Sequence, residues 1–394
     1  MIALVVGGGI AGPVTALALR KAGIDATVYE AYPDGADGIG GTLTVAPNGL
    51  DALRIVGADE PVRAAGLPMD RTVVADGRGR TLGELAALPG LPPTRALWRG
   101  ELYRALHDHA LAAGVRIVHG KRLAGVDDAP DGITARFADG SAATGDLLVG
   151  ADGVHSTVRR LIDPAGPGPD HVPLLNFGGA ADIAVPAPAG AMSFVFGRRA
   201  FLGYWPEPDG RTAWFGNLPH DTPMTADKAR AVPAEELLAR LRDVYGDDVP
   251  ARDLVAHTRP EELAAFGSIE ILPAARRWYR GRMVLVGDAA HAPSPSSGQG
   301  ASLAAESAVQ LARCLRDVPD LERAFAAYER LRRPRVEQVA ARAAKTNGSK
   351  GLGPVGRTLM GLLMPLATRT FMTPERLLGP EQRHTIDWEA TVTA

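Results

Sequence analysis

The stretch Gly7-Gly8-Gly9-Ile10-Ala11-Gly12 follows directly on an apolar run at residues 2–6. A continuous apolar run that meets glycine at once is typical of a buried parallel strand. Residues 11–22 then have the composition of a helix, and residues 25–30 form a second strand-like run that ends at Glu30. Strand, glycine-rich turn, helix and strand in this order predict a βαβ unit with the fingerprint of a dinucleotide site.

The glycines of this turn have separate physical tasks. Gly7 permits the tight turn, Gly9 lets the backbone approach a pyrophosphate, and Gly12 allows close packing of helix on strand. The helix N-terminus adds N–H groups and the positive end of the helix dipole. Glu30 can accept hydrogen bonds from both hydroxyls of an adenosine ribose. This unit by itself does not separate NAD from FAD.

Two later motifs repeat the pattern of an apolar strand that ends in an acidic turn. Residues 146–149 lead into Gly150-Ala151-Asp152-Gly153, and residues 283–286 lead into Gly287-Asp288-Ala289-Ala290-His291. A carboxylate at such a strand end can hydrogen-bond a polyol such as a ribityl chain. Ser297-Gly298-Gln299-Gly300-Ala301-Ser302 then opens a long helix, whose N–H donors can lie beside the pyrimidine edge of an isoalloxazine ring. Together the three motifs predict a protein that holds an extended FAD.

These residues closely resemble the para-hydroxybenzoate hydroxylase family, the class A flavoprotein monooxygenases. The resemblance extends over nearly the whole chain to about residue 340. Its markers are Gly7 to Gly12, Glu30, Arg99 at the head of its helix, Ala151-Asp152-Gly153, Gly287-Asp288-Ala289-Ala290-His291, Pro295 and Gly298-Gln299-Gly300. The combination is specific to the family and says little about the substrate.

The resemblance implies which residues bind the cofactor. The adenosine half would be held by Gly7, Gly9, Ile10, Ala11, Gly12 and Glu30. Leu123 would offer its backbone to the adenine, and Thr44 would face the FAD. Arg99 would contact the pyrophosphate or ribityl region and Asp288 the ribityl and pyrophosphate portion, while Asp152 is associated in the family with both FAD and the transient nicotinamide donor. The flavin-ring loop would comprise Pro295, Gly298, Gln299, Gly300, Ala301 and Ser302.

Some positions depart from the family pattern. Where the family often has Asn two residues after Gly300 and Asp four residues later, this chain has Ser302 and Glu306. Both substitutes can hydrogen-bond, so we expect FAD binding to survive. The run Trp214-Phe215-Gly216-Asn217-Leu218-Pro219 has Gly where the Trp-x-Trp-x-Ile-Pro signature of flavin halogenases has its second Trp. The sequence has no second Gly-rich nucleotide fold for NAD(P)H, which agrees with the class A type.

The resemblance implies an NADH- or NADPH-driven hydroxylation. The donor would reduce FAD by hydride transfer, O2 would add at flavin C4a, and the hydroperoxide would deliver its distal oxygen to an aromatic or polyketide-like small molecule. Because the cofactor carries this chemistry, we expect no catalytic side-chain nucleophile and no metal. Alternatives are an FAD enzyme that performs epoxidation, oxidative decarboxylation or antibiotic inactivation, and a non-catalytic flavin-binding sensor.

Aromatic residues concentrate between residues 170 and 280, which hold 12 of the 21 in the chain (5 Trp, 7 Tyr and 9 Phe). Ordinary packing of a sheet core accounts for part of this concentration. Alternation along a strand sends Trp214 to one side and Phe215 and Asn217 to the other. One of these faces is expected to meet the flavin ring and a flat substrate, with Arg199 and Asn217 as the polar groups that orient it.

The interleaved order of these segments predicts an α/β fold: a Rossmann-like FAD-binding domain interleaved with a mostly antiparallel β-sheet substrate domain, plus C-terminal helices. Residues 1–172 would form the first part of the FAD-binding domain, with an inserted segment of about 45–95 on the substrate side. Residues 173–280 would form the sheet-rich substrate domain. Residues 281–345 would complete the FAD-binding domain with two long helices, and 346–394 would be a tail that packs on the body.

Composition narrows the class of protein further. A net charge of −2 leaves no electrostatic footprint for nucleic acid. The single cysteine, Cys314, excludes a disulfide framework and a cysteine metal site. The most apolar late run, residues 359–366, is far shorter than the roughly 20 residues that span a bilayer. We therefore expect a cytoplasmic monomer or homodimer whose partner is a small aromatic molecule, without a nucleic acid partner or a membrane span.

Overall fold

A six-stranded sheet carries the glycine-rich motifs in the computed structural model, which describes residues 1–35, 40–272, 274–350, 356, 363–364 and 373–393. Its strand order is β18 (Tyr279–Arg280), β19 (Met283–Leu285), β12 (Leu147–Gly150), β1 (Ile2–Val6), β2 (Asp25–Tyr29) and β8 (Arg116–Val118). All neighbours pair in parallel except β18 with β19. Since parallel strands end at one edge, the turns after β1, β12 and β19 meet there.

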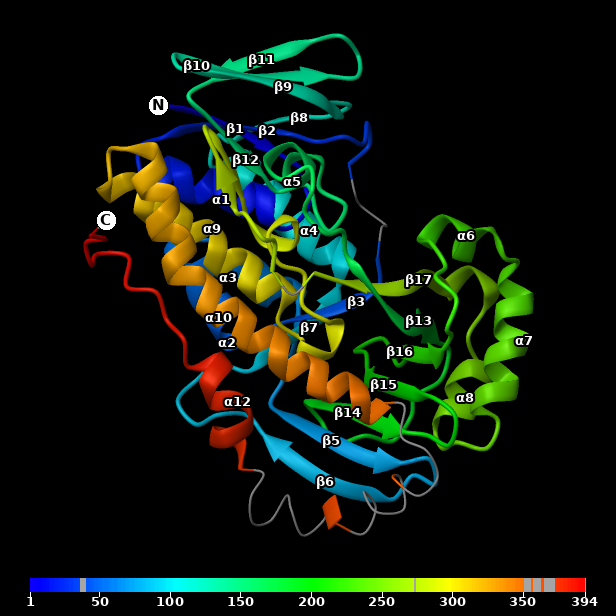
Figure 1. Ribbon diagram of the computed structural model, residues 1–394. Helices are drawn as coiled ribbons and strands as arrows, with labels where there is room; N and C mark the ends of the chain where they lie inside the picture. The colour runs from blue at the N-terminus through cyan, green and yellow to red at the C-terminus, as the bar shows by residue number, and fades with distance from the viewer. Residues whose placement is uncertain (36–39, 273, 351–355, 357–362, 365–372, 394) are drawn as a thin grey trace.

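Helices cover the faces of this sheet (Figure 1). They are α1 (Ala11–Lys21), α4 (Arg99–Ala112), α9 (Gly300–Asp317) and α10 (Leu321–Lys350), with the shorter α2 (Pro47–Ile55), α3 (Asp59–Ala65) and α5 (Thr157–Ile162) beside them. Helix α9 lies against α1, α2 and α10. The buried residues of α1 and of α9 thus join the strands in one continuous apolar core.

Two small sheets flank the nucleotide sheet. One is the antiparallel sheet of β9 (Leu123–Ala129), β10 (Gly132–Phe137) and β11 (Ala142–Gly145). The other contains β3 (Thr42–Val45), β7 (Thr94–Trp98) and β4 (Leu67–Met69), in the order β3-β7-β4. This second sheet lies between the nucleotide sheet and the large antiparallel sheet (Figure 1).

The large sheet has seven strands. Their order is β17 (Ala264–Ile271), β13 (Asp170–Ala181), β16 (Thr212–Pro219), β15 (Phe201–Pro206), β14 (Ala191–Phe196), β5 (Arg71–Asp76) and β6 (Thr81–Ala86). Every pair is antiparallel except β14 with β5. Strands β5 and β6 come from early in the chain, so the sheet is complete only when segments far apart in sequence pair with one another.

One face of the seven-stranded sheet is covered by helices. They are α6 (Ala226–Ala231), α7 (Ala234–Tyr245) and α8 (Ala251–Ala256), and they share a buried cluster with the sheet. Figure 1 shows these helices on the side of the sheet away from the nucleotide unit. The structure therefore confirms the predicted α/β fold with a mostly antiparallel second sheet, while the exact domain boundaries stay a prediction.

The last described residues pack on α9. After α12 (Pro374–Gln382), Arg316 donates to the carbonyl oxygen of Trp388 at 2.6 Å, and Asp317 accepts from the backbone N–H of Val392 at 2.8 Å. The apolar run 359–366 lies outside the described residues apart from 363–364. Within the described part of the chain, no helix has both the length and the apolar character that crossing a membrane requires.

Glu306 on α9 is the centre of a buried ion network. Its carboxylate accepts from Arg332 at 2.6 Å and from Arg335 at 2.8 Å, both on α10, and from Asn48 on α2 at 2.7 Å. Arg335 also donates to the carbonyl oxygen of Glu381 on α12 at 2.8 Å. Burial opposes ionisation of Glu306, yet Arg332 and Arg335 hold its pKa at about 2. One carboxylate therefore ties together three helices, one of which also holds the C-terminal segment.

We expect Glu306→Gln to destabilise the fold by about 3–5 kcal/mol, because it leaves the buried Arg332 without its counter-charge. The folded pKa lies below the ordinary value of 4.5. This carboxylate therefore stabilises the fold above about pH 4.5, and the contribution is lost as the pH falls toward 2. Urea unfolding between pH 3 and 7 measures both effects.

The matched control is Glu329→Gln on α10, whose carboxylate pairs with Arg333 in a partly exposed position. Removal of such a pair costs about 0–1 kcal/mol. Equal losses in the two variants would contradict a central role for Glu306.

Candidate functional site

The first glycine turn lies directly against the second motif. Gly7 has a φ of +103°, a conformation that favours glycine, and a Cβ there would approach the carbonyl oxygen of Ala151 to 2.5 Å. A Cβ at Gly12 would lie 1.9 Å from the carbonyl oxygen of Gly7. Only glycine fits either position. Because no side chain projects from these positions, a phosphate can approach the backbone N–H groups of the turn closely.

Glu30 closes the other side of this turn. Its buried carboxylate accepts from the backbone N–H of Gly8 at 2.6 Å and of Tyr32 at 2.8 Å. A carboxylate has about four acceptor positions, so capacity remains for ribose hydroxyls. The N–H of Lys121 donates to the carbonyl oxygen of Glu30 at 2.7 Å, which holds the start of β9 at Leu123 near this end of the site.

His107 contacts the glycine turn, which the sequence did not indicate. Its Nε2 lies 2.8 Å from the carbonyl oxygen of Gly8, and its ring stacks on Tyr103 with centroids 4.1 Å apart. Burial lowers the pKa of His107, so the imidazole is neutral at pH 7 and donates this bond through an Nε2–H. The sequence shows only a histidine on a helix, with nothing to connect it to the glycine turn.

Arg99 and Asp288 bring the first and third motifs together. A Cβ at Gly9 would lie 3.8 Å from Nη2 of Arg99, which begins α4. Burial lowers the pKa of Arg99, against the opposing charges of Asp288 and Glu30. Burial likewise raises the pKa of Asp288 to about 6, with Arg99 pulling it down.

The side chain of Asp288 nevertheless stays accessible to solvent, although protein surrounds it. Such a carboxylate borders a deep hollow rather than filling a core. Arg99 and Asp288 therefore place a positive and a negative charge side by side at the edge where the parallel strands end.

The flavin-ring loop predicted from the sequence is anchored on β3 and α2. Thr44 donates to the carbonyl oxygen of Gly298 at 3.1 Å, and Asn48 donates to the side-chain oxygen of Gln299 at 2.9 Å. The hydroxyl of Ser302 accepts from the N–H of Ala46 at 3.0 Å. The side chains of Gln299 and Ser302 are already bonded to Asn48 and Ala46. This loop can therefore bind a ligand mainly through its backbone groups.

The remaining residues of this loop lie where they can border a ligand. Pro295 begins a short 3₁₀ turn, η3 (Pro295–Ser297), and its side chain is exposed. Gly300 and Ala301 form the first residues of α9 and are half-buried. The N-terminus of α9 therefore points its N–H groups toward the loop.

The carboxylate of Asp152 makes hydrogen bonds to the start of the next helix that the sequence did not indicate. Its carboxylate accepts from the hydroxyl of Ser156 at 2.5 Å and from the N–H groups of Thr157 and Val158 at 2.7 and 3.1 Å. These contacts cap the N-terminus of α5. A contact between Asp152 and FAD or a nicotinamide donor stays a prediction, and its carboxylate is already engaged.

His291 in the third motif is buried and lies 2.9 Å from the hydroxyl of Ser307 through Nε2. Burial, together with the charge of Arg332, lowers its pKa to about 3. A neutral imidazole held against α9 orders the loop that leads to Pro295 and takes no proton at pH 7.

The expected substrate strand is β16, and its two faces have different surroundings. Trp214 is fully buried under α7 and α8, and its indole N–H donates to the hydroxyl of Thr258 at 2.9 Å. Phe215 points the other way, with its ring centroid 6.0 Å from Phe201 and 6.3 Å from Trp205. Asn217 shares the face of Phe215 and is 3% exposed.

Of the expected pocket residues, the structure thus brings Phe215 and Asn217 together and separates the other two. Trp214 belongs to the core beneath the sheet because strand alternation turns it toward the helices. Arg199 lies in the exposed turn before β15 and pairs with Asp243 on α7 at 2.9 Å. Its guanidinium pairs with a surface carboxylate away from Phe215 and Asn217, and a contact between Arg199 and the substrate stays a prediction.

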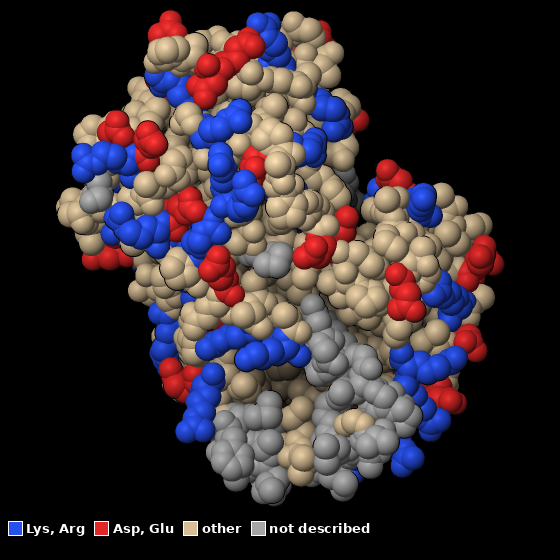
Figure 2. Space-filling view, viewed as in Figure 1, with Lys and Arg blue, Asp and Glu red and all other residues tan. Residues whose placement is uncertain are grey.

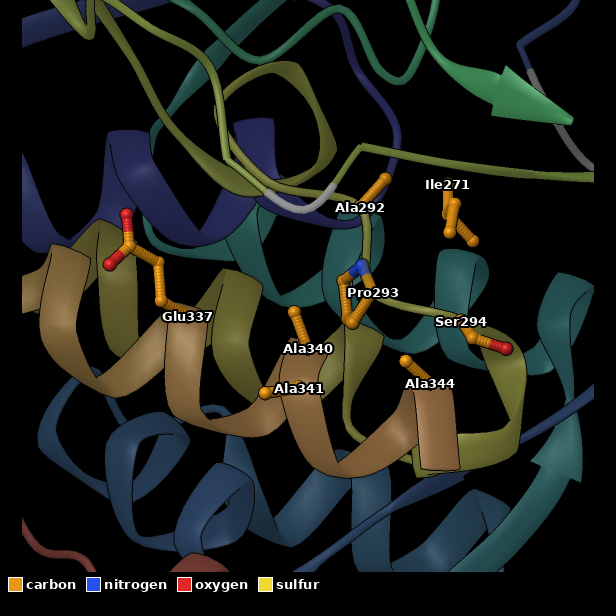
Figure 3. Close-up of a pocket in the computed structure, with 8 residues that line it drawn as sticks. All are labelled: Ile271, Ala292, Pro293, Ser294, Glu337, Ala340, Ala341 and Ala344. Carbon is orange, nitrogen blue, oxygen red and sulfur yellow. The ribbon is translucent and has the colours of Figure 1, made fainter. Parts of the chain in front are cut away.

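The face that carries Phe215 packs on β4 and β7, whose Met69, Ala96 and Trp98 share a cluster with Trp205 and Phe215. Phe266 of β17 packs so closely on Gly41 that a Cβ there would lie 2.6 Å from its ring. Five residues on, Ile271 lines a mostly apolar pocket of about 230 Å³ with Ala292, Pro293 and Ser294 (Figure 3). The opposite wall of this pocket is Glu337, Ala340, Ala341 and Ala344 of α10. Phe266 therefore joins the large sheet to the segment before β3, the strand whose Thr44 holds the flavin-ring loop.

Charges of both signs are interspersed on the face of the molecule in Figure 2. Arg and Lys alternate with Asp and Glu, and the described residues there form no broad patch of one sign. Among the described residues, no group of three or more His, Cys, Asp or Glu side chains is arranged to hold a metal ion.

Comparison with known proteins gives consistent similarities. A family model described as "FAD binding domain" matches residues 1–343. The chain is 31% identical over 358 residues to the aurachin C monooxygenase/isomerase of Stigmatella aurantiaca, covering 90% of this chain and 89% of that protein. It is 31% identical over 352 residues to the FAD-dependent urate hydroxylase of Klebsiella pneumoniae, covering 88% and 89%. The crystal structure of Klebsiella pneumoniae HpxO complexed with FAD and uric acid superposes with a TM-score of 0.85 at 28% identity, covering 97% of this chain and 96% of that one.

The raised pKa of Asp288 predicts that the folding stability of the apoprotein depends on pH. Between about pH 4 and 6 the folded state keeps a proton that the unfolded state has lost, so stability falls as the pH rises through this window. Asp288→Asn mimics the protonated acid, so the apo variant should unfold at a higher temperature than the parent at pH 8. At pH 4 the parent and the variant should unfold at the same temperature.

The same variant should bind FAD about ten- to a hundredfold more weakly, since it lacks a charged acceptor worth about 1.5–3 kcal/mol. Flavin fluorescence titration measures the affinity. The control is Asp209→Asn, which removes a carboxylate from an exposed turn. Unchanged FAD affinity in Asp288→Asn would show that this residue does not face the cofactor.

Proposed function

Because this chain belongs to the family of FAD-binding domains that matches residues 1–343, we propose that it is an FAD-dependent monooxygenase using NADH or NADPH and O2 to hydroxylate an aromatic or polyketide-like small molecule. The observation that supports this most directly is the meeting of three motifs at one edge of the parallel sheet, opposite an aromatic face. The family, the fold and FAD are confirmed as predicted. The nicotinamide donor, the oligomeric state and a cytoplasmic location stay predictions.

The residues at this edge fit an FAD molecule. The turn Gly7 to Gly12 excludes side chains where a pyrophosphate would approach, and Glu30 retains acceptor capacity for a ribose. Arg99 would neutralise phosphate charge, and Asp288 would accept from ribityl hydroxyls in the hollow that it borders. The loop at Gly298 would meet the ring. FAD, when bound, supplies the redox chemistry that activates O2.

The chain contributes charge stabilisation at the ring. The N-terminus of α9 begins at Gly300, and its dipole and unpaired N–H groups favour negative charge in front of it. The side chains of Thr44 and Asn48 hold the preceding loop, so these donors keep their places during turnover. Preorganised donors of this kind cost no reorganisation when charge develops.

The sheet face contributes shape and exclusion of water. Phe194, Phe201, Trp205 and Phe215 form a continuous set of ring contacts on the side that faces the cofactor edge. A flat apolar wall can hold a planar substrate and keep water from the reacting atoms. Asn217, buried in the same face, is the polar group that we propose orients the ring.

The proposal is tested by screening NADH and NADPH oxidation against phenols, heteroaromatics and polyketides, with ¹⁸O₂ as the oxygen source. A hydroxylase transfers one labelled oxygen atom to the product, whereas a flavin-binding sensor consumes the nicotinamide slowly whatever compound is added. Label in an epoxide, or loss of CO2 from the substrate, would identify the alternative outcomes.

Phe215→Ala should leave FAD bound but admit water to the site. NAD(P)H would still be consumed, with hydrogen peroxide replacing part of the hydroxylated product. Trp214→Ala should instead destabilise the fold by about 3–5 kcal/mol, because it empties a buried site under the helices. Its ratio of product to NAD(P)H should stay near that of the parent.

Peroxide assay and thermal unfolding separate the two variants. A parental product ratio in Phe215→Ala would show that this face does not line the active site. A lowered ratio confined to Trp214→Ala would reverse our assignment of the two faces.

A further inference from the structure

Asn176 and Asn217 form an amide pair on the face of the sheet that carries Phe215. They lie directly opposite each other on β13 and β16, and Nδ2 of Asn217 donates to Oδ1 of Asn176. Nδ2 of Asn217 also lies 3.2 Å from the carbonyl oxygen of Gly216. In this arrangement the oxygen of Asn176 accepts and the nitrogen of Asn217 donates.

The pair lies close to Phe266: a Cβ at Gly178, two residues from Asn176 on the same strand face, would lie 3.4 Å from the ring of Phe266. Asn176 pairs across β17 with Gly267, which lies between Phe266 and Ile271 in sequence. Phe266 packs on Gly41, next to the strand that carries Thr44. Ile271 shares a pocket with Ser294, the residue before Pro295 (Figure 3). The amides therefore lie on the face of Phe215, one step along the strands from the point where Phe266 reaches Gly41.

The rest of this face is apolar. Strand alternation and the registers of β13 to β16 assign it Asn176, Gly178, Ala180, Met192, Phe194, Phe196, Phe201, Gly203, Trp205, Ala213, Phe215 and Asn217. No side chain in this set carries a charge. A substrate carboxylate placed here would lose its hydration without gaining a cation, which is strongly unfavourable. The face suits a neutral ligand with a small polar edge.

The orientation of the pair defines that edge. The bond between the amides uses the oxygen of Asn176 and the nitrogen of Asn217. The nitrogen of Asn176, with two N–H groups, and the oxygen of Asn217 lie outside this bond. An amide oxygen has two lone pairs, so that of Asn217 can accept from a ligand in addition to a protein donor. The pair thus offers a donor from one strand and an acceptor from the next.

We propose that this pair selects substrates with a lactam edge: a ring carbonyl, which accepts from Asn176, beside a ring N–H, which donates to Asn217. The substrate class is therefore a neutral nitrogen heteroaromatic of the pyridone or quinolone kind. The inference rests on the proposed monooxygenase function and adds the identity of the group that the enzyme recognises.

Titration of the holoenzyme with matched bicyclic probes tests the proposal. The probes are 2-quinolone, its 1-methyl derivative without the N–H, 2-naphthol and 2-naphthoate, and the readout is the change in flavin absorbance. We expect 2-quinolone to bind at least about tenfold more tightly than each of the others, since a buried polar group left unpaired costs about 1–3 kcal/mol. Equal binding of 2-quinolone and its 1-methyl derivative, or tighter binding of 2-naphthoate, would overturn the proposal.

Variants assign the effect to the pair. Asn176→Asp keeps the shape and the oxygen that accepts from Asn217 but removes the N–H donors, so it should weaken 2-quinolone binding about tenfold while FAD stays bound. Asn176→Ala should do the same if it folds. Arg240→Ala, on the exposed side of α7, is the control and should bind 2-quinolone like the parent. Parental 2-quinolone affinity in Asn176→Asp would also overturn the proposal.

Failure of the inference can be distinguished from failure of the proposed function. If 2-naphthol or 2-naphthoate supports NAD(P)H-dependent oxygen insertion and 2-quinolone does not bind, the enzyme is a monooxygenase with another substrate class. If the purified chain retains no FAD, both proposals fall.

Discussion

The parallel pairing of β12 with β1 and β19 is the constraint on which the site depends. Backbone hydrogen bonds fix the carboxyl ends of these three strands next to one another, so turns that are far apart in sequence become neighbours. Gly7 then lies against Ala151, and Arg99 approaches both Gly9 and Asp288. A slip of one residue in register would move a turn along the edge by about 3.3 Å and send each side chain of that strand to the opposite face of the sheet, which would separate the motifs.

A second constraint comes from charge rather than backbone pairing. Glu306 is buried with two arginines, and the same carboxylate accepts from Asn48, which in turn donates to Gln299 in the flavin-ring loop. A buried carboxylate persists only when its charge is matched and its oxygens are bonded. The network therefore couples the packing of α9 and α10 to the position of the loop, and Arg335 extends it to the C-terminal segment.

Strand alternation gives the central strands of the large sheet two faces with different surroundings. Trp214 and Tyr245 pack in the layer between sheet and helices, whereas Phe215 and Asn217 lie on the opposite face of the sheet. The aromatic content of this region consequently serves two purposes. One set of rings fills the core, and the other forms a wall whose only polar groups, in the rows from β13 to β16, are two amides.

The sequence by itself determined the α/β class, the three strand-turn motifs and the FAD chemistry. These are local signals: apolar runs of strand length, glycines where a side chain cannot fit, and acids at strand ends. The two late helices were predictable for the same reason, since the pattern of each lies within one stretch of the chain.

Only the tertiary structure decided which side chains share a space. Asp152 caps α5 because Ser156 and the first N–H groups of that helix lie within its reach. Arg199 turns to Asp243 on a helix that no local pattern links to it, and His107 reaches Gly8 across 99 residues. Strand alternation predicted two faces for β16, but which face meets the cofactor depends on where α7 and α8 pack, a long-range contact that local sequence does not encode.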